Sequence, residues 1–447
     1  MAVLPPELWI KVLVHVARPD GVGDEFEDWP SYYGWRRTPL NLATVCRDWR
    51  ELVHACSDMW VGLSYSISDN SITNGGLLGV QAWLARSGSR PLSLEFTCYC
   101  QDPLILNAFL EVFYPYFPRL AVLRIGMGGG VWGDILPIPR VDMPLCSFVS
   151  TGFANEEYVA WFAPFFRNEL PALRALQMRE YITSTISHMP VEHHISNLTH
   201  LDAVANNFKM RPVDVLRGCP HLVACRLYFR LGHNDDSNGM PGDTTCEPFT
   251  MAQLRTLWIR VKTRYYWRDV FAHASFPILE DITLIGSMWP VTTFAPCLKR
   301  SRCPLRHLSL PGCNASAIAV VAVLEAVTDT LETFHFSGGD SSGGLFGFND
   351  TLLDALNPQQ QTMLVPRLHS LKIISGSALQ TTAGKLLDVV RARMTSTRTV
   401  PFRTIDLSCY SDESRKSGSH KLDFEGLLRL GQQHSELTVK VYPDMLA

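Results

Sequence analysis

Apolar residues recur at helical spacing in a stretch at the very start of the chain. Leu8, Val12 and Val16 are four residues apart and form one stripe of a predicted helix. Other apolar residues between them add two more stripes, whereas an amphipathic surface helix needs only one. Pro5 and Pro6 suit the first turn, where the N–H group that proline lacks would have no partner. A helix apolar on nearly every face is either fully buried or shared between its own core and a partner.

A second helical pattern covers residues 45–56. Its apolar positions fall on one face and its charged positions on the other, which is typical of an amphipathic helix. Thr38 and Pro39 form a signal for the start of a short helix before it. Residues 59–67 alternate between apolar and polar and predict a short strand. Residues 18–38 show no sustained period, so we interpret them as an inserted loop.

A phrase of three apolar positions returns along the rest of the chain. It reads Leu, two residues, an apolar residue, one residue and a second apolar residue. Its copies begin at Leu120, Leu145, Leu173, Leu198, Leu222, Leu254, Leu279, Leu305, Leu331, Leu368 and Phe402. The copy Leu145-Phe148-Ser150 is a poor one. Most copies are 24 to 28 residues apart, and the wider intervals coincide with polar or looser inserts at 232–247, 338–347 and 375–383.

This spacing predicts repeats of the leucine-rich type, whose length is roughly 20–29 residues. The copy that begins at Leu305 continues to Cys313, as the pattern of that repeat requires. Helical patterns lie between the phrases, so each repeat is a strand, a turn and a helix that cannot bury its apolar side alone. The predicted fold class is α/β, with a small three-helix module followed by an irregular leucine-rich-repeat-like α/β solenoid.

The composition is that of an ordinary globular protein, with 46% apolar and 19% charged residues and a net charge of −3. This charge gives no global reason to expect nucleic acid or an acidic membrane surface as a partner. The longest apolar run is about half of the roughly 20 residues that span a bilayer. The twelve cysteines are scattered, and no secretory signal is recognisable, so we interpret them as buried thiols. We expect a cytoplasmic or nuclear protein with no membrane or nucleic-acid partner.

No group of residues predicts catalysis, a cofactor or a metal site. The glycines of residues 126–130 depart from a phosphate-binding loop, because Val131 stands where the third glycine is needed. The four histidines between positions 188 and 200 match no zinc-site spacing. No Ser/His/Asp or Cys/His set can be assembled. We therefore expect that the protein is not an enzyme and has no cofactor.

One stretch interleaves basic and aromatic residues. Trp258 and Ile259 belong to a repeat strand, and a further set follows that strand, where solenoids display binding residues. This set comprises Lys262, Arg264, Tyr265, Tyr266 and Arg268. Such mixtures can hold phosphate or stack on bases. Two interpretations remain open: the residues serve the fold, or they bind an acidic or phosphorylated protein segment.

The first sixty-five residues resemble the F-box. The resemblance rests on Leu4-Pro5-Pro6-Glu7-Leu8, Val45-Cys46-Arg47-Asp48-Trp49-Arg50 and Trp60, which occur in the order of the F-box pattern. The long insert is the departure from that pattern. Residues 80–96 resemble the helix and strand that fungal F-box proteins carry after the box. We thus expect an F-box-like module over 1–65, with the inserted loop 18–38, and a substrate-binding solenoid over 66–447.

The resemblance implies a substrate-recognition subunit of a cullin-type (SCF) ubiquitin ligase. In that family the F-box docks on a Skp-type adaptor, the adaptor links to a cullin, and the rest of the chain holds a protein substrate. The residues that the resemblance assigns to the adaptor are Leu4, Pro5, Pro6, Leu8, Leu13, Cys46, Trp49 and Trp60. Cys46 and Trp49 are shared with the core of the module. Two alternatives remain: an F-box scaffold or sequestering protein without ubiquitin output, and a solenoid enzyme or nucleic-acid binder whose first helix is a cap.

Overall fold

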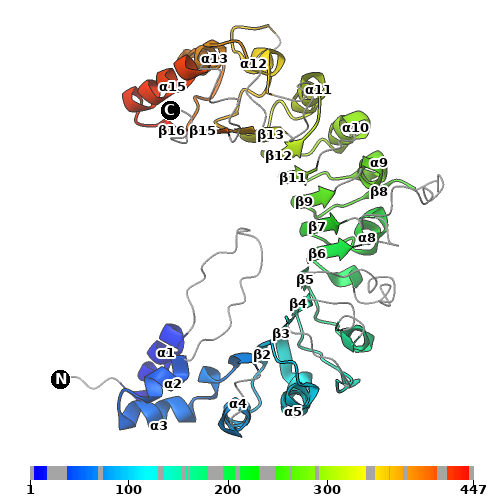
Figure 1. Ribbon diagram of the computed structural model, residues 1–447, viewed down its shortest axis with the longest axis vertical. Helices are drawn as coiled ribbons and strands as arrows, with labels where there is room; N and C mark the ends of the chain where they lie inside the picture. Colours follow the sequence, from blue (N-terminus) through cyan, green and yellow to red (C-terminus); the bar gives the residue numbers. More distant parts are fainter. Residues whose placement is uncertain are drawn as a thin grey trace. The chain divides into compact units, whose positions relative to one another are not determined.

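The computed structural model describes residues 5–17, 38–68, 74–128, 135–153, 158, 161–179, 195–206, 212–230, 247–261, 264–286, 291–338, 348–361, 363–375, 381–409 and 420–441. The chain divides into two compact units, Met1–Met210 and Arg211–Ala447. In each unit, short parallel strands alternate with helices along the chain (Figure 1).

The described part of unit 1 begins with α1 (Pro6–Ala17), α2 (Thr38–Ala43) and α3 (Arg47–Ala55). The elements that follow are η1 (Ser57–Met59), β1 (Gly62–Ile67), α4 (Asn74–Arg86), β2 (Leu92–Cys98), α5 (Pro103–Phe113), η2 (Tyr114–Arg119), β3 (Leu120–Met127), β4 (Phe148–Phe153), η3 (Ala163–Arg167), β5 (Ala175–Arg179), η5 (Ile195–Asn197) and β6 (His200–Asn206). The strands pair in sequence order and in parallel. Because β1 starts at Gly62, the predicted boundary between residues 65 and 66 lies inside a strand of the sheet.

Alternate apolar residues of the strands build the core of unit 1. The register aligns one row of buried residues, namely Leu63, Leu94, Leu123, Val149, Leu176 and Leu201. Successive side chains of a strand point to opposite faces, so the third apolar position of each phrase, two residues after the second, points the same way as the second. The phrases that begin at Leu120, Leu173 and Leu198 coincide with β3, β5 and β6, as the repeat pattern predicts.

The phrase assigned to Leu145 is wrong by one residue. Leu145 is 45% exposed, whereas Cys146, Val149 and Thr151 are buried. Val149 pairs with the core rows of both neighbouring strands. The repeat pattern gave the wrong register for this strand, because Thr151 places a polar residue at a core position and Phe148 places a large apolar residue on the opposite face. There Phe148 is buried in a small cluster with residues of β3 and β5.

The described part of unit 2 continues the same architecture. Its elements are α8 (Pro212–Gly218), β7 (Ala224–Arg230), β8 (Phe249–Thr250), β9 (Thr256–Val261), α9 (Arg264–His273), β10 (Ala274–Ser275), β11 (Asp281–Ile285), α10 (Val291–Ser301), β12 (His307–Cys313), α11 (Ala317–Ala326), β13 (Thr333–Gly338), α12 (Asp350–Leu356), β14 (Ser370–Ser375), α13 (Lys385–Thr395), β15 (Thr404–Cys409), α15 (Lys421–Gln433) and β16 (Thr438–Val441). The strand order is β7-β9-β11-β12-β13-β14-β15-β16, all parallel, and β8 and β10 form a separate pair. The helices cover one face of this sheet (Figure 1). The phrases from Leu222 to Phe402 coincide with β7, β9 and β11–β15, and β16 is an additional strand.

The described cysteines are free thiols, and most of them are part of the core. Cys46 is the exposed one among the nine that the structure describes. Burial raises the pKa of Cys146 and of Cys219 to about 12, and that of Cys297 to about 11. Thiols with such a pKa stay protonated at neutral pH and are poor nucleophiles. The interpretation of the cysteines as small buried apolar groups is confirmed for eight of the nine described ones, and Cys46 is the exception.

A buried carboxylate joins the last two described helices of unit 2. Asp423 on α15 is fully buried and accepts hydrogen bonds from the backbone N–H groups of Gly384 (2.8 Å) and Leu387 (3.0 Å) at the start of α13. Nδ1 of His420 lies 3.4 Å from the same carboxylate. Burial alone raises the pKa of Asp423, but the hydrogen bonds from His420, Leu387 and Gly384 together outweigh burial and lower it below 3.8. The carboxylate therefore caps α13 from a neighbouring helix.

We expect Asp423→Ala to lower the free energy of unfolding by about 2 kcal/mol at pH 7, because the cap is lost and buried N–H groups lose their acceptor. The pKa of Asp423 is lower in the folded than in the unfolded chain. Its contribution is therefore complete above the unfolded value and is lost as the pH falls below about 3.8. Thermal unfolding followed by circular dichroism across this range should show the two proteins converging. Asp388→Ala, at an exposed site of α13, is the control, and a gap that does not change with pH would contradict the assignment.

Candidate interaction surface of the N-terminal helices

The three N-terminal helices pack around aromatic side chains and a buried leucine. The rings of Trp9 on α1 and Trp49 on α3 lie 5.8 Å apart, and Leu13 on α1 is 2% exposed. Nε of Arg50 donates a hydrogen bond of 2.9 Å to the carbonyl oxygen of Ala43, the last residue of α2. Together α1, α2 and α3 form a small packed group with its own contacts.

Local hydrogen bonds fix the start of two of these helices. The carbonyl oxygen of Pro5 accepts from the N–H groups of Leu8 (3.0 Å) and Trp9 (3.2 Å), and the proline itself is exposed. Cys46 precedes α3, and its Sγ accepts a hydrogen bond of 3.4 Å from the N–H group of Trp49. Cys46 is exposed as well. The sequence places both residues at helix starts, where the carbonyl group of Pro5 and the thiol of Cys46 accept from N–H groups of the first turn.

Four large apolar side chains of these helices remain exposed to solvent. Leu8 is 44% exposed, Val12 45%, Leu40 44% and Val45 60%. Leu8 and Val12 are one helical turn apart on α1, while Leu40 lies on α2 and Val45 in the turn before α3. We call these four residues the N-terminal apolar surface. Single exposed apolar residues are ordinary, but four on so small a group of helices make this group a candidate interaction surface.

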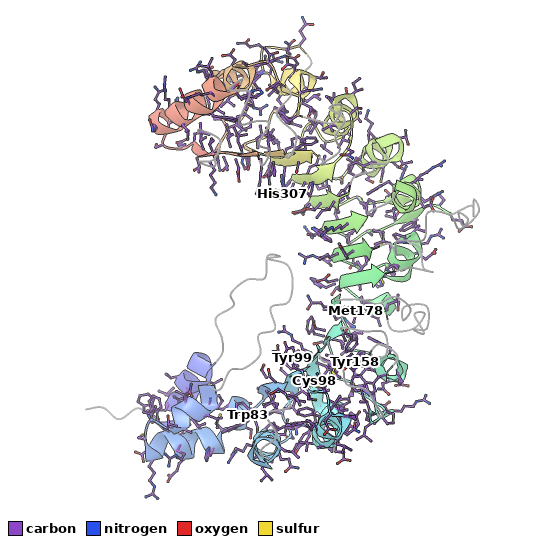
Figure 2. All side chains as sticks on the ribbon, in the orientation of Figure 1. Trp83, Cys98, Tyr99, Tyr158, Met178 and His307 are labelled. Atoms are coloured by element: carbon purple, nitrogen blue, oxygen red, sulfur yellow. The ribbon has the colours of Figure 1, made fainter. Side chains whose placement is uncertain are left out.

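Two residues assigned to the adaptor interface are buried inside unit 1, which corrects that assignment. Leu13 is 2% exposed, and Trp60 is fully buried. Nε1 of Trp60 donates a hydrogen bond of 2.8 Å to the carbonyl oxygen of Val53 on α3. Its ring meets that of Trp83 edge-on at 4.8 Å, and the guanidinium of Arg86 lies 4.9 Å from its centre. Trp83, labelled in Figure 2, lies on α4. Trp60 thus joins α3 to the first repeat and offers no surface to a partner.

The other residues of the predicted interface divide by exposure. Pro5, Leu8 and Cys46 are exposed, and Trp49 is half-buried against Trp9. Leu4 and the side chain of Pro6 lie outside the described residues. The F-box resemblance did not assign Val12, Leu40 or Val45, which the structure exposes. Val12 could have been found, because it shares the first apolar stripe with Leu8.

Four of the five residues of the second predicted surface lie at the start of α9, apart from the strand that precedes them. Trp258 and Arg260 lie on β9, whereas Arg264, Tyr265, Tyr266 and Arg268 lie at the start of α9. Arg268 is exposed, and the side chains of the other three, like all of Lys262, lie outside the described residues. Helix α9 covers one face of the sheet (Figure 1). Closeness in sequence therefore does not place the strand residues and the helix residues on one surface. The prediction for the helix residues stays untested.

The described part of the chain contains no group of three or more His, Cys, Asp and Glu residues that could hold a metal ion. None of the described helices is long and apolar enough to cross a membrane.

Comparisons with known proteins add little to this description. No family model matches the chain, and no curated protein matches it. Among solved structures, 25 chains match. One of them is an internalin (inlF) from Listeria monocytogenes str. 4b F2365, with 11% identity, a TM-score of 0.38, and coverage of 81% of this chain and 82% of the internalin chain. At this score the likeness carries no argument, and the repeat architecture rests on the parallel strand pairing described above. The chain is a mixed α/β protein built from parallel strands and helices, consistent with a leucine-rich-repeat-like solenoid.

Proposed function

We propose that this protein is the substrate-recognition subunit of a cullin-type ubiquitin ligase and that its N-terminal helices dock on a Skp-type adaptor. The observation that carries the proposal is the N-terminal apolar surface, with Leu8, Val12, Leu40 and Val45 all more than 40% exposed. It lies within the segment whose Leu-Pro entry and Val-Cys-Arg-x-Trp sequence resemble the F-box. The adaptor supplies an apolar partner for side chains that the chain itself leaves uncovered.

The recognition mode that fits is a helix laid into a groove, in which a few apolar anchors provide most of the binding energy. Pro5, Leu8 and Cys46 keep their assignment to the adaptor, and Trp49 is placed at its edge. Leu13 and Trp60 instead support these helices from inside. The strand–helix units beyond β1 hold the protein substrate, and the protein performs no covalent chemistry itself. It increases the effective concentration of its substrate near a conjugating enzyme. Such a subunit works in the cytoplasm or nucleus.

The direct test is the affinity of the full chain for a purified Skp-type adaptor. Leu8→Ala removes apolar area that is half exposed in the free chain, so we expect about 1.4 kcal/mol less binding energy, or roughly a tenfold loss of affinity. Isothermal titration calorimetry measures this loss. Ile318→Ala is the matched control, because Ile318 is 76% exposed on α11 of unit 2 and should leave the affinity unchanged. An equal effect of both substitutions, or no binding by the unaltered chain, would refute the docking proposal.

A second measurement separates the ligase subunit from a scaffold. The complex of chain, adaptor and cullin is supplied with a charged conjugating enzyme, and ubiquitin transfer to the chain itself or to a bound protein is followed. Transfer that depends on Leu8 supports the ligase subunit. Adaptor binding without any transfer indicates the scaffold or sequestering alternative instead. A chain that binds no adaptor revives the interpretation of α1 as a cap.

A further inference from the structure

The edge of the sheet at which strands β12 to β15 begin carries three exposed arginines. Arg306 and Arg403 directly precede β12 and β15, and Arg367 lies in the turn before β14. His307, which Figure 2 labels, is the first residue of β12 and marks this edge. All three arginines are exposed. We call Arg306, Arg367 and Arg403 the arginine edge.

Backbone hydrogen bonds place the starts of these strands side by side. The N–H group of Glu332 donates to the carbonyl oxygen of Arg306 (2.9 Å), and that of His369 donates to the carbonyl oxygen of Glu332 (3.0 Å). The N–H group of Arg403 in turn donates to the carbonyl oxygen of His369 (2.7 Å). The four residues therefore form one row across the strand starts. Neighbouring strands are about 4.8 Å apart, so the two arginines at the ends of the row are about 14 Å apart.

The nearest carboxylates in this row are paired with other residues. Glu332 lies beside Arg306, but its carboxylate oxygen is 3.9 Å from Nε2 of His369. Glu280, on the other side of Arg306, forms an ion pair with Arg255. None of the carboxylates that the structure describes forms an ion pair with a member of the arginine edge. The three guanidinium groups are therefore available to carboxylates of another molecule.

Hydrogen bonds to its two neighbours hold Arg367 in position. Nη2 of the buried Arg393 donates to the carbonyl oxygen of Leu368 (3.0 Å). The N–H group of Val400 donates to the carbonyl oxygen of Pro366 (2.8 Å), which connects the same turn to the segment before β15. Because the backbone on both sides of Arg367 is fixed, less conformational freedom is lost when this arginine binds a partner.

We propose that the arginine edge binds an acidic segment of a partner protein, which runs in extended form across the starts of β12 to β15. Contacts between arginine and carboxylate are charge-assisted and can be bidentate. An extended chain advances about 3.4 Å per residue, so acidic residues four positions apart point to one side and match the distance of about 14 Å between Arg306 and Arg403. Arg367 precedes β14, which lies between β12 and β15, and supplies a third cation. Under the proposed function the segment belongs to the substrate, and only this assignment rests on that function.

The test uses the full chain without adaptor, so its outcome does not depend on the proposed adaptor binding. The probe is a fluorescein-labelled peptide of six glutamates, followed by fluorescence anisotropy at low ionic strength. The control peptide of six glutamines has the same length and no side-chain charge. We expect the glutamate peptide to bind at least about tenfold more tightly than the control, with an affinity that falls as salt is added.

Two unlabelled competitor peptides of identical composition test the extended placement. Glu-Ser-Thr-Ser-Glu-Ser has its carboxylates four positions apart, whereas Glu-Glu-Ser-Thr-Ser-Ser has them next to each other. We expect the first peptide to displace the probe at a concentration about threefold lower, because it can reach both ends of the row at once. Equal displacement by the two peptides would overturn the extended placement.

Substitutions in the chain test whether binding occurs at the arginine edge. Arg306→Gln and Arg403→Gln should each weaken binding of the glutamate peptide about threefold, because one exposed charge pair is lost, and together about tenfold. Arg391→Gln removes the same charge from α13, where Arg391 is 4.0 Å from Asp388, and should have no effect. All variants should keep the thermal unfolding midpoint of the unaltered chain.

The proposal would be overturned by a chain that does not bind the glutamate peptide, or by binding that the glutamine peptide equals. Binding that the double substitution of Arg306 and Arg403 leaves unchanged would overturn it as well. Tighter binding of a glutamine peptide with a single phosphoserine would overturn the carboxylate assignment in favour of phosphate.

Discussion

Replacing Arg393 by methionine should lower the free energy of unfolding of this protein by about 4 kcal/mol, although Arg393 belongs to no interaction surface. Arg393 lies on α13 and is fully buried. Burial lowers the pKa of its guanidinium to about 10, so the group still carries its charge at neutral pH. Methionine preserves much of the volume but none of the hydrogen-bond donors.

Hydrogen bonds from the guanidinium connect the loop between α12 and β14 to α13. Its nitrogen atoms donate to the carbonyl oxygens of Leu356 (3.1 Å), Val365 (3.1 Å) and Leu368 (3.0 Å). Val365 has a φ of 48°, which a β-branched residue adopts at a cost. The hydrogen bond from Arg393 to its carbonyl oxygen therefore stabilises a turn whose backbone conformation is unfavourable by itself. Without the guanidinium, several buried carbonyl groups lose their partner at once, and each costs about 1–3 kcal/mol.

The measurement is thermal or chemical unfolding of the full chain. A loss of about 4 kcal/mol corresponds to a midpoint lower by roughly 10 °C for a unit of this size. Arg391→Met removes the same charge two residues earlier, at an exposed site 4.0 Å from Asp388, and should change stability by less than about 0.5 kcal/mol. Equal effects of both substitutions would show that Arg393 acts through charge alone and not through its buried donors.

The repeat architecture was predictable because burial imposes its own pattern. Each strand must place apolar residues at alternate positions, so Leu305, Leu308 and Leu310 could be recognised without any structure. The pattern failed at β4, because Thr151 occupies a core position and Phe148 is buried on the opposite face. Alternation tells which residues share a face, but it does not tell which of two apolar faces is the core.

Contacts between residues that are far apart in the chain could not be predicted from the sequence. Arg226 and Trp258 are brought together by the pairing of β7 with β9, with β8 between them in the chain. The sequence placed Arg260 beside Lys262 and Arg264, its neighbours in the chain, whereas the sheet places it beside Tyr228. Arg393 is one of several arginines in helical patterns, and an arginine in such a pattern is usually solvated. Its burial depends on carbonyl groups of a loop far from it in sequence.

Apolar periodicity also could not distinguish burial within the chain from burial by a partner. Leu8 and Leu13 both lie in the apolar stripes of α1, yet Leu8 is 44% exposed and Leu13 is 2% exposed. Which stripe faces inward depends on where α3 lies against α1, and the ring contact of Trp9 with Trp49 establishes that arrangement. The likeness to the F-box drew attention to this segment, and the structure shows which of its large apolar side chains are exposed.

Trp60→Ala should therefore act on stability and not on the proposed adaptor contact. The indole is fully buried, donates to the carbonyl oxygen of Val53 and packs against Trp83. Its removal leaves a large cavity between α3 and α4, with an expected cost of about 3–5 kcal/mol for unit 1. This loss should be visible as a lower unfolding midpoint, and adaptor binding by the fraction that remains folded should be unchanged.

A smaller change separates the two roles of Trp60 without unfolding the protein. Trp60→Phe keeps a ring but leaves the carbonyl group of Val53 without its donor, which should cost about 1–2 kcal/mol of stability. Trp83→Phe is the matched control, because the indole N–H of Trp83 has no hydrogen-bond partner among the residues that the structure describes, so its removal should cost less. If Trp60 contacts the adaptor, Trp60→Phe should weaken binding as Leu8→Ala does. If Trp60 holds α3 against the first repeat, adaptor affinity should stay within about twofold while only stability falls.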